Sequence, residues 1–175
     1  MGTQYRLYNG HMPTTGGPPA GVVTSATLFT QLQIVTAAGF PGKVIEWGVS
    51  FNGAALVAGF PCALITTGAI AATVTAFAAA DAMPYCDPNA PANTTAGSTS
   101  YPFNMSTATS GFTSSAEGSI SATRLMDHAL VEPIGGYFKQ FPLGLQPGIA
   151  PAEVLRVMVL GDGTTKVTAY VVIEV

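Results

Sequence analysis

Few residues of this sequence have the type and spacing that catalysis or metal binding requires. The chain of 175 residues contains two histidines, His11 and His128, and two cysteines. Asp127 directly precedes His128, as a proton relay would need. Adjacent side chains on a strand point to opposite faces, however, so these two cannot pair directly. His11 lies in a Gly/Pro-rich segment. The sequence therefore predicts no histidine-based catalytic centre.

The usual motifs of metal, phosphate and nucleophile sites do not occur either. The sequence has no His-x-His or Cys-x-x-Cys pair, no Gly-x-Ser-x-Gly elbow and no glycine-rich loop joining a strand to a helix. Glu46 and Glu117 could meet across space as a glycosidase pair, but nothing in the sequence brings them together. We expect no catalytic residue, metal or cofactor, and an enzyme of the glycosidase or cupin type ranks last among the alternatives.

The two cysteines, Cys62 and Cys86, could form a disulfide or remain reduced. The opening residues MGTQYRLYNG contain one arginine and no apolar run, so no signal peptide is expected. Without secretion, two reduced thiols are the default, with Cys62 a small core residue of its strand. Neither cysteine has a base nearby in the sequence, so neither is expected to be a nucleophile.

The composition points to protein partners. Charged residues make up 9% of the chain, against about 25% in an ordinary soluble domain. The six lysines and arginines are scattered and the net charge is −3, which argues against nucleic acid. The uncharged stretch from Trp47 to Ala80 contains glycines, a proline and threonines, which favours neutral strands joined by turns over a membrane helix. A neutral, weakly apolar surface suggests packing against copies or a partner.

The segment KVIEWGVSF, Lys43–Phe51, has the period of a half-buried strand. Trp47 falls on the inward face and is the expected core anchor. Glu46 falls on the other face and marks the outer side or an interface. The inward face also takes Ile45, Val49 and Phe51, and the other takes Val44, Gly48 and Ser50.

About eight segments have strand character and are separated by Gly/Pro turns. We predict an all-β, single-domain β-sandwich, a jelly roll of about eight antiparallel strands. The last two strands would form a hairpin around Gly161–Gly163, with Arg156 pointing outward. An alanine-rich stretch, Ile70–Ala82, could form one short helix. The expected strands are Gln4–Asn9, Leu32–Ala38, Lys43–Phe51, Pro61–Thr67, Ala122–Val131, Gly136–Phe141, Glu153–Leu160 and Lys166–Val175.

Two segments fall outside this pattern, the Gly/Pro-rich stretch Asn9–Thr24 and the stretch Asp81–Ser119. For the domain division we assign residues 1–24 to an N-terminal arm and 25–175 to the sandwich domain, with a long loop at 81–119. The loop would dock on its own sandwich or on a neighbouring subunit. Candidate contacts between subunits are the aromatic residues and prolines of these regions, namely Tyr5, Tyr8, Pro18, Pro19, Tyr85, Tyr101, Phe103 and Phe112.

Several segments together suggest a protein family: TSATLFTQLQI, KVIEWGVSFNG, TGAIAATVTA, PYCDPNAP, GFTSSAEGSISATRLMD, KQFPLG and YVVIEV. They resemble segments of the head decoration, or cement, proteins of tailed bacteriophages. The resemblance runs from about Thr24 to the C-terminus. Glu46-Trp47-Gly48 and the stretch Lys139–Gly144 carry most of it.

The resemblance implies a non-enzymatic β-sandwich on the outside of an icosahedral shell. Its partners would be the major capsid protein and copies of itself, often as a trimer, with no nucleic acid and no membrane. It would be made in the host cytoplasm and located on the outer capsid surface of the virion. The alternative is a ligand- or carbohydrate-binding β-sandwich of a phage tail or cell-surface assembly, whose favoured feature would be a stripe of exposed aromatic residues.

Overall fold

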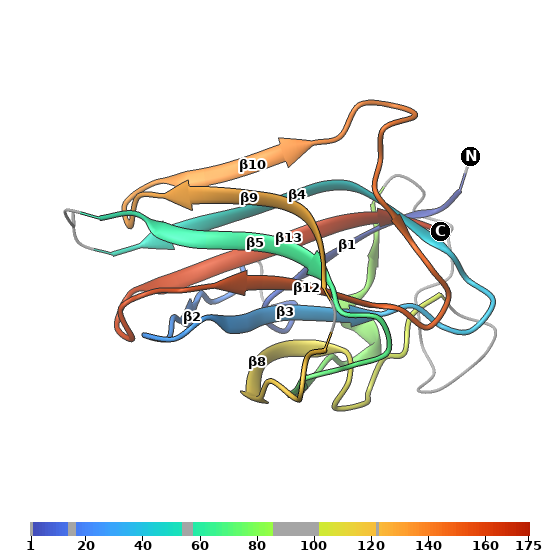
Figure 1. The fold of residues 1–175 in the computed structure, drawn as a ribbon, viewed down its shortest axis with the longest axis horizontal. Helices are drawn as coiled ribbons and strands as arrows, with labels where there is room; N and C mark the ends of the chain where they lie inside the picture. Colours follow the sequence, from blue (N-terminus) through green and yellow to red (C-terminus); the bar gives the residue numbers. More distant parts are fainter. Residues whose placement is uncertain (1, 14–16, 54–57, 86–101, 122) are drawn as a thin grey trace.

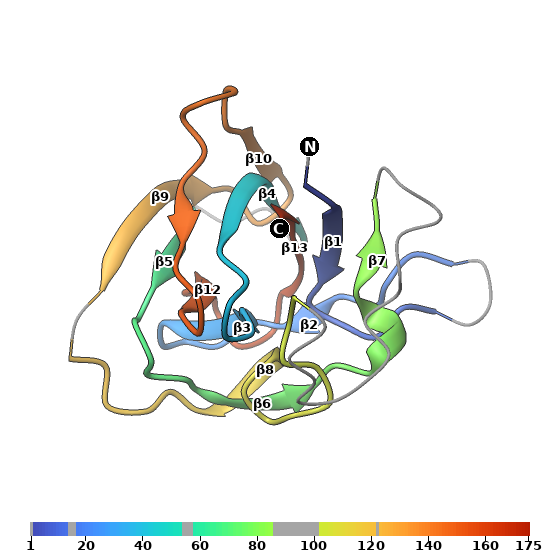
Figure 2. The ribbon, with the colours of Figure 1, turned by 90° about the vertical axis from the view of Figure 1, so that its right-hand side faces the viewer.

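The computed structural model describes residues 2–13, 17–53, 58–85, 102–121 and 123–175. It is an all-β protein in which two antiparallel sheets pack face to face as a β-sandwich (Figures 1 and 2). The two predictions on Cys86 and Tyr101 lie outside the described residues.

Sheet A has the strand order β10-β4-β13-β1-β7, with β11 pairing with β4 and β2 pairing with β13. Sheet B has the order β6-β8-β3-β12-β5-β9. The strands of sheet A are β1 (Gln4–Tyr8), β2 (Val22–Val23), β4 (Gly42–Asn52), β7 (Met83–Pro84), β10 (Gly136–Gln140), β11 (Gly148–Ile149) and β13 (Lys166–Glu174). Those of sheet B are β3 (Phe29–Val35), β5 (Phe60–Thr66), β6 (Thr73–Ala76), β8 (Gly111–Ala116), β9 (Arg124–Val131) and β12 (Val154–Val159).

All eight strands expected from the sequence are present, with their ends shifted by up to three residues. β2, β7 and β11 have two residues each, too few to show an alternating pattern. β6 and β8 are built from small residues such as alanine, serine and threonine, which produce little hydrophobic contrast between the two faces of a strand.

The short helix expected within Ile70–Ala82 is wrong for most of that stretch. Thr73–Ala76 forms strand β6, which pairs with β8, and only Ala79–Asp81 forms a turn of 3-10 helix. Three consecutive β-branched residues, Thr73–Thr75, and a partner strand outweigh the helical preference of alanine here. The expected loop at 81–119 also contains strands β7 and β8.

The expected hairpin between the last two strands is also wrong, because β12 belongs to sheet B and β13 to sheet A. The turn at Gly161–Gly163 instead carries the chain from one sheet to the other. Asp162 organises it by accepting hydrogen bonds from the backbone N–H groups of Thr164 and Thr165 at 2.8 and 2.7 Å. A turn rich in glycine and aspartate serves either connection.

A β-bulge changes the faces at the start of β4. Val172 pairs with Glu46 and Ile173 with Val44, so the ladder skips Ile45. Val44 is therefore fully buried and Ile45 only half-buried, the reverse of the alternation expected from the sequence. Beyond the bulge the expected pattern holds, and Trp47 has no exposed surface.

The core lies between the sheets and is dominated by aliphatic side chains from β3, β5, β12 and β13. Aromatic pairs link distant segments across it. Phe51 and Phe60 join the two sheets with ring centroids 5.2 Å apart. Tyr5 packs edge-on against Phe103 with ring centroids 5.3 Å apart. This contact fixes the segment that begins at residue 102 onto β1.

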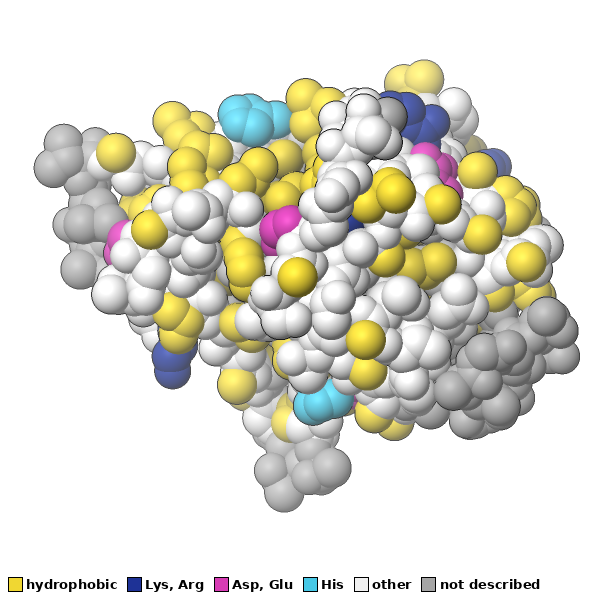
Figure 3. All heavy atoms as spheres, turned by 60° about the horizontal axis from the view of Figure 1, so that its bottom comes forward, with side chains coloured by type: hydrophobic (Ala, Val, Ile, Leu, Met, Phe, Trp, Pro, Cys, Tyr) yellow, Lys and Arg dark blue, Asp and Glu magenta, His cyan; other side chains and the backbone are white. Residues whose placement is uncertain are grey.

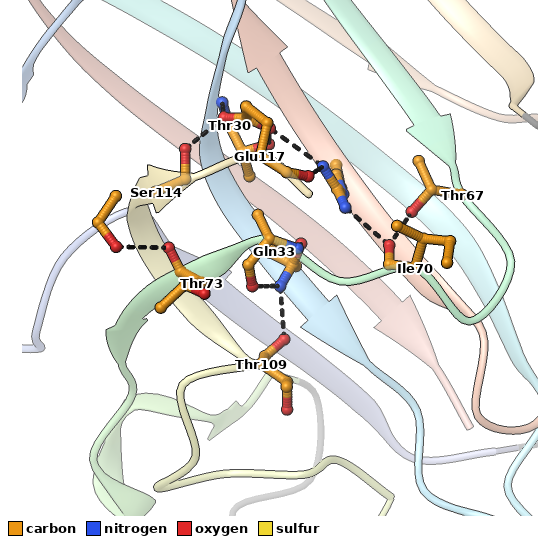
Figure 4. Close-up of polar contacts among 11 residues, drawn as sticks. Thr30, Gln33, Thr67, Ile70, Thr73, Thr109, Ser114 and Glu117 are labelled. Atoms are coloured by element: carbon orange, nitrogen blue, oxygen red, sulfur yellow. Dashed lines mark hydrogen bonds and ion pairs between the residues drawn. The ribbon is translucent and has the colours of Figure 1, made fainter. Parts of the chain in front are cut away.

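Arg156 on β12 does not point to solvent, as expected, but is fully buried. The segment between β5 and β6, through Ile70, and the segment after β8, through Glu117, cover it on the outer face of sheet B (Figure 4). Its guanidinium donates to Oε2 of Glu117 at 3.0 Å, to the Glu117 backbone carbonyl at 3.1 Å and to the Ile70 carbonyl at 2.7 Å. Burial lowers the pKa of Arg156, and the charge of Glu117 opposes that change.

Glu117 is in turn held by strand β3 and by β8. Thr30 donates its backbone N–H to Oε1 at 2.7 Å and its hydroxyl to Oε2 at 2.6 Å, and the Ser114 hydroxyl donates to Oε1. Figure 4 shows Thr30, Ser114 and Glu117 converging on one point. Gln33 extends the polar layer by exchanging hydrogen bonds with the backbone of Ala72 at 2.9 and 3.0 Å.

Replacing the carboxylate tests this network. We expect Glu117→Ala to lower the free energy of unfolding by about 2–3 kcal/mol, below the 3–5 kcal/mol typical of a broken buried pair because the Glu117 side chain is 26% exposed. Urea unfolding measures the change. The control is Glu132→Ala, an exposed carboxylate, which should change it by less than about 0.5 kcal/mol. If both substitutions lowered the free energy of unfolding by the same amount, the stabilising role of the Glu117 network would be contradicted.

Candidate interaction surface

Asp127 forms the main polar contact between the two sheets at the side of the sandwich where β9 meets β10. Its Oδ2 accepts hydrogen bonds from Trp47 Nε1 at 2.9 Å and from the Tyr137 hydroxyl at 2.7 Å. Its Oδ1 accepts from Lys139 Nζ at 3.2 Å. Because β9 is the last strand of sheet B and β10 the last strand of sheet A, this carboxylate joins the two edges.

Three segments that are far apart in the sequence meet at this cluster. Trp47 comes from KVIEWGVSFNG, Asp127 ends GFTSSAEGSISATRLMD, and Lys139 begins KQFPLG. Strand pairing places Lys139 opposite Trp47 and Gln140 opposite Glu46. Segments far apart in the sequence therefore share one structural task, which is to hold β10 and the loop after it against the sandwich.

The electrostatics of the cluster favour the ionised carboxylate. Burial opposes the charge of Asp127, but hydrogen bonds from Tyr137, Trp47 and Lys139 outweigh it, so the pKa of Asp127 lies below its ordinary value. Burial and the neighbouring carboxylate raise the pKa of Tyr137 to about 12, so its hydroxyl remains a donor at neutral pH. The ring of Tyr137 packs on Trp47 with centroids 5.3 Å apart.

The loop after β10 is a fixed turn that exposes apolar side chains. Phe141 is buried and its backbone N–H donates to the Ile45 carbonyl at 2.8 Å. Leu145 closes the turn by donating to the Pro142 carbonyl at 2.9 Å, and Gly144 between them has φ 85°. Leu143 at the tip is 95% exposed, so nothing in the described protomer covers it.

Large exposed hydrophobic side chains concentrate along one continuous stretch of chain, through β9, β10 and the loop after them. Strands β9 and β10 lie side by side at the upper margin of Figure 1. We call the exposed hydrophobic residues of this stretch the apolar edge: Leu125, Leu130, Ile134, Phe138, Leu143 and Leu145. Figure 3 shows another face, on which charged side chains are isolated among hydrophobic and neutral atoms. The described surface thus offers apolar contact with little charge.

The contact candidates named from the sequence have different environments. Tyr5 and Phe103 are buried inside the protomer, although they belong to the expected arm and loop. Tyr8, Pro19 and Phe112 are half-buried, and Pro18 and Tyr85 are exposed. Phe112 contacts Phe77 and His11. None of these side chains belongs to the apolar edge.

Two functional features had little signal in the sequence. The imidazole of His11 lies 2.7 Å from Asp81, whose other oxygen accepts the Met12 backbone N–H at 2.7 Å, so the segment after β1 is tied to the 3-10 turn. The apolar edge was missed because its leucines are spread over strands, a turn and a loop. The signal that could have found it is the leucines in RLMDHAL, on the expected strand, and in KQFPLGL, where the chain passes through a Pro/Gly turn.

The remaining chemical candidates stay separate. Glu46 lies on the outer face of sheet A, where it binds the Tyr170 hydroxyl, while Glu117 lies on the outer face of sheet B, so the two carboxylates are on opposite sides of the sandwich. His128 is exposed on β9. Cys62 is a buried free cysteine, and burial raises the pKa of its thiol to about 12.

Within the described ranges, no three His, Cys, Asp or Glu side chains are grouped closely enough to hold a metal ion. The same residues include no helix with the length and apolar character needed to cross a membrane. The uncharged stretch from Trp47 to Ala80 contains the end of β4 and the whole of β5 and β6, so its described residues include neutral strands, as expected. Comparisons with protein-family models, with curated proteins and with solved structures found no match to this chain.

The Asp127 cluster predicts a pH-dependent contribution to stability. A carboxyl whose pKa is lowered by folding stabilises the protein above its unfolded pKa, about 4, and loses this contribution as the pH falls through the folded value. We expect Asp127→Asn to lower the unfolding free energy by about 2 kcal/mol at pH 7, and the gap from wild type to shrink below about pH 4. Urea unfolding at pH 7 and pH 3 measures it, with exposed Glu132→Gln as the control. If wild type and Asp127→Asn differed in unfolding free energy by the same amount at both pH values, the role of the Asp127 charge would be refuted.

Proposed function

We propose that this protein is a non-enzymatic structural protein that binds the outer surface of a bacteriophage capsid and stabilises it. The observation that carries the proposal is the apolar edge, which exposes six large hydrophobic side chains along β9, β10 and the loop after them. Burying apolar surface contributes about 25 cal/mol per Å². Several exposed large hydrophobic side chains on a sparsely charged protein support a protein partner.

The anchoring of the apolar edge supports permanent contact. The turn after β10 is fixed by the Pro142–Leu145 hydrogen bond and by Gln146, whose side chain accepts the Gly144 N–H at 2.8 Å. The Asp127 cluster holds β10 behind it. A preformed surface loses little conformational entropy on binding. On a shell with many equivalent sites, modest contacts of this kind add up through avidity.

Further parts of the proposal concern assembly. The major capsid protein would be the partner, the protein would form a homo-oligomer with a trimer favoured, and the virion surface would be its location. The same proposal includes a jelly-roll order of the strands. It also includes contacts between subunits made by the arm at 1–24 and the loop at 81–119. Among the described residues of those two regions, Pro18 and Tyr85 have exposed side chains available for such contacts.

Binding to shells provides the test. Purified protein would be mixed with shells that lack it and separated by gradient sedimentation, with the protein quantified in the particle band. Wild type should sediment with the shells at a fixed ratio to the shell protein. The double variant Leu143→Asp, Leu145→Asp should lose at least about tenfold in affinity, since two charges would have to be desolvated at the contact. Both side chains are exposed, so folding should be unaffected.

The matched control is Leu28→Asp, which puts the same charge at an exposed leucine outside the apolar edge and should bind as wild type. Wild-type protein that remains at the top of the gradient would overturn the proposed function. Equal binding by the double variant would show instead that another surface makes the contact.

A further inference from the structure

The outer face of sheet A carries a row of aromatic side chains that the apolar edge does not explain. Strand register places Phe138 of β10 opposite Gly48 of β4, Gly48 opposite Tyr170 of β13, and Tyr170 opposite Tyr8 of β1. Four neighbouring strands therefore present three aromatic rings and one glycine in a single row. None of the three rings is buried.

The glycine in this row allows Tyr170 to lean across the sheet. A Cβ at position 48 would lie 2.6 Å from Cε1 of Tyr170, so any other residue would displace the ring. The hydroxyl of Tyr170 donates to Oε1 of Glu46 at 2.6 Å, which fixes the ring in that position. Tyr8 stands beside it with ring centroids 5.9 Å apart. The result is a fixed aromatic platform on an open sheet face.

A groove of about 550 Å³ lies over this platform. Phe138 and Gly136 line it on one side and Tyr8 and Arg6 on the other. Ser50 and Thr168, which are paired in the next row, contribute hydroxyl groups. This combination of aromatic walls and a few polar groups is typical of small-ligand sites, and the volume falls in their usual range.

The charges at the groove balance each other. Arg6 lies 3.8 Å from Glu46 as an ion pair, and its guanidinium lies over the ring of Tyr85 at 4.0 Å and near that of Tyr170 at 5.3 Å. An anionic ligand would need a cation that is not already engaged, and Arg6 is the only cation lining the groove among the described residues. The site therefore suits a ligand that is uncharged, has a flat apolar face and carries hydroxyl groups.

We propose that this groove binds a neutral saccharide. The C–H face of a pyranose ring would stack on the aromatic platform, whose faces carry partial negative charge. Its hydroxyl groups would exchange hydrogen bonds with the hydroxyls of Ser50 and Thr168 and accept hydrogen bonds from the Arg6 guanidinium. The proposal can be tested separately from capsid binding, because Phe138 is the one groove residue that also belongs to the apolar edge.

The test is a glycan array probed with the full chain, followed by calorimetric titration. The neutral probes are oligomers of glucose, galactose, mannose and N-acetylglucosamine, and the anionic probes are polygalacturonate and heparin. We expect at least one neutral oligomer to bind, and Tyr8→Ala to weaken that binding at least tenfold. Thr168→Val, which removes one hydroxyl and keeps the β-branched shape, should weaken it about three- to tenfold.

Leu28→Ala is the control, because it removes an exposed apolar side chain that lies outside both the groove and the apolar edge and should leave the saccharide affinity unchanged. Unfolding midpoints of both groove variants would be measured alongside. Thr168→Val keeps the strand preference of threonine and is the variant that decides the result if Tyr8→Ala does not fold. Binding to none of the neutral probes, binding to the anionic probes alone, or unchanged affinity in a folded groove variant would overturn the proposal.

Discussion

A guanidinium without exposed surface determines how the outer side of sheet B is built. Arg156 lies on a central strand, where a charge is costly unless it is paired and hydrogen-bonded. The partners come from outside the sheet, because Glu117 and the Ile70 carbonyl lie in segments that cross over β12. Those segments must stay in place for the charge to be tolerated. Chain regions made of small, weakly apolar residues are thereby held in a single position, which packing of alanine, serine and threonine alone would define poorly.

Other charged side chains also link segments that are distant in the sequence. A chain with 9% charged residues places several of them in contacts that join segments distant in sequence. The contacts are Arg156–Glu117, Lys139–Asp127, Arg6–Glu46 and His11–Asp81. They join β12 to the segment after β8, the edge strands of the two sheets, β1 to β4 across β13, and the segment after β1 to the 3-10 turn. Few charges are left for the rest of the surface, so solubility depends on a small number of charged side chains.

Alternation of apolar and polar residues was enough to identify the long strands, the inward face of Trp47 and the outward face of Glu46, because burial on one face leaves a period of two. It could not reveal that β12 and β13 belong to different sheets, since a Gly-Asp-Gly turn fits a hairpin and a crossing equally. It misplaced Val44 because a bulge leaves no trace in hydrophobicity. The aromatic row was invisible for a simpler reason: its four members come from four strands, and only their register makes them neighbours.

The position of β13 between β4 and β1 has a consequence for biosynthesis. Sheet A cannot be completed until β13 is made, although β1 leaves the ribosome near the beginning of translation. At roughly 5–20 residues per second, β1 waits on the order of ten seconds for its partner. During that time the apolar faces of β1 and β4 lack their central strand, and sparse charge gives little protection against self-association. Such long-range pairing also slows folding itself. Production of this protein in a cell should therefore depend on chaperones that shield an incomplete sheet.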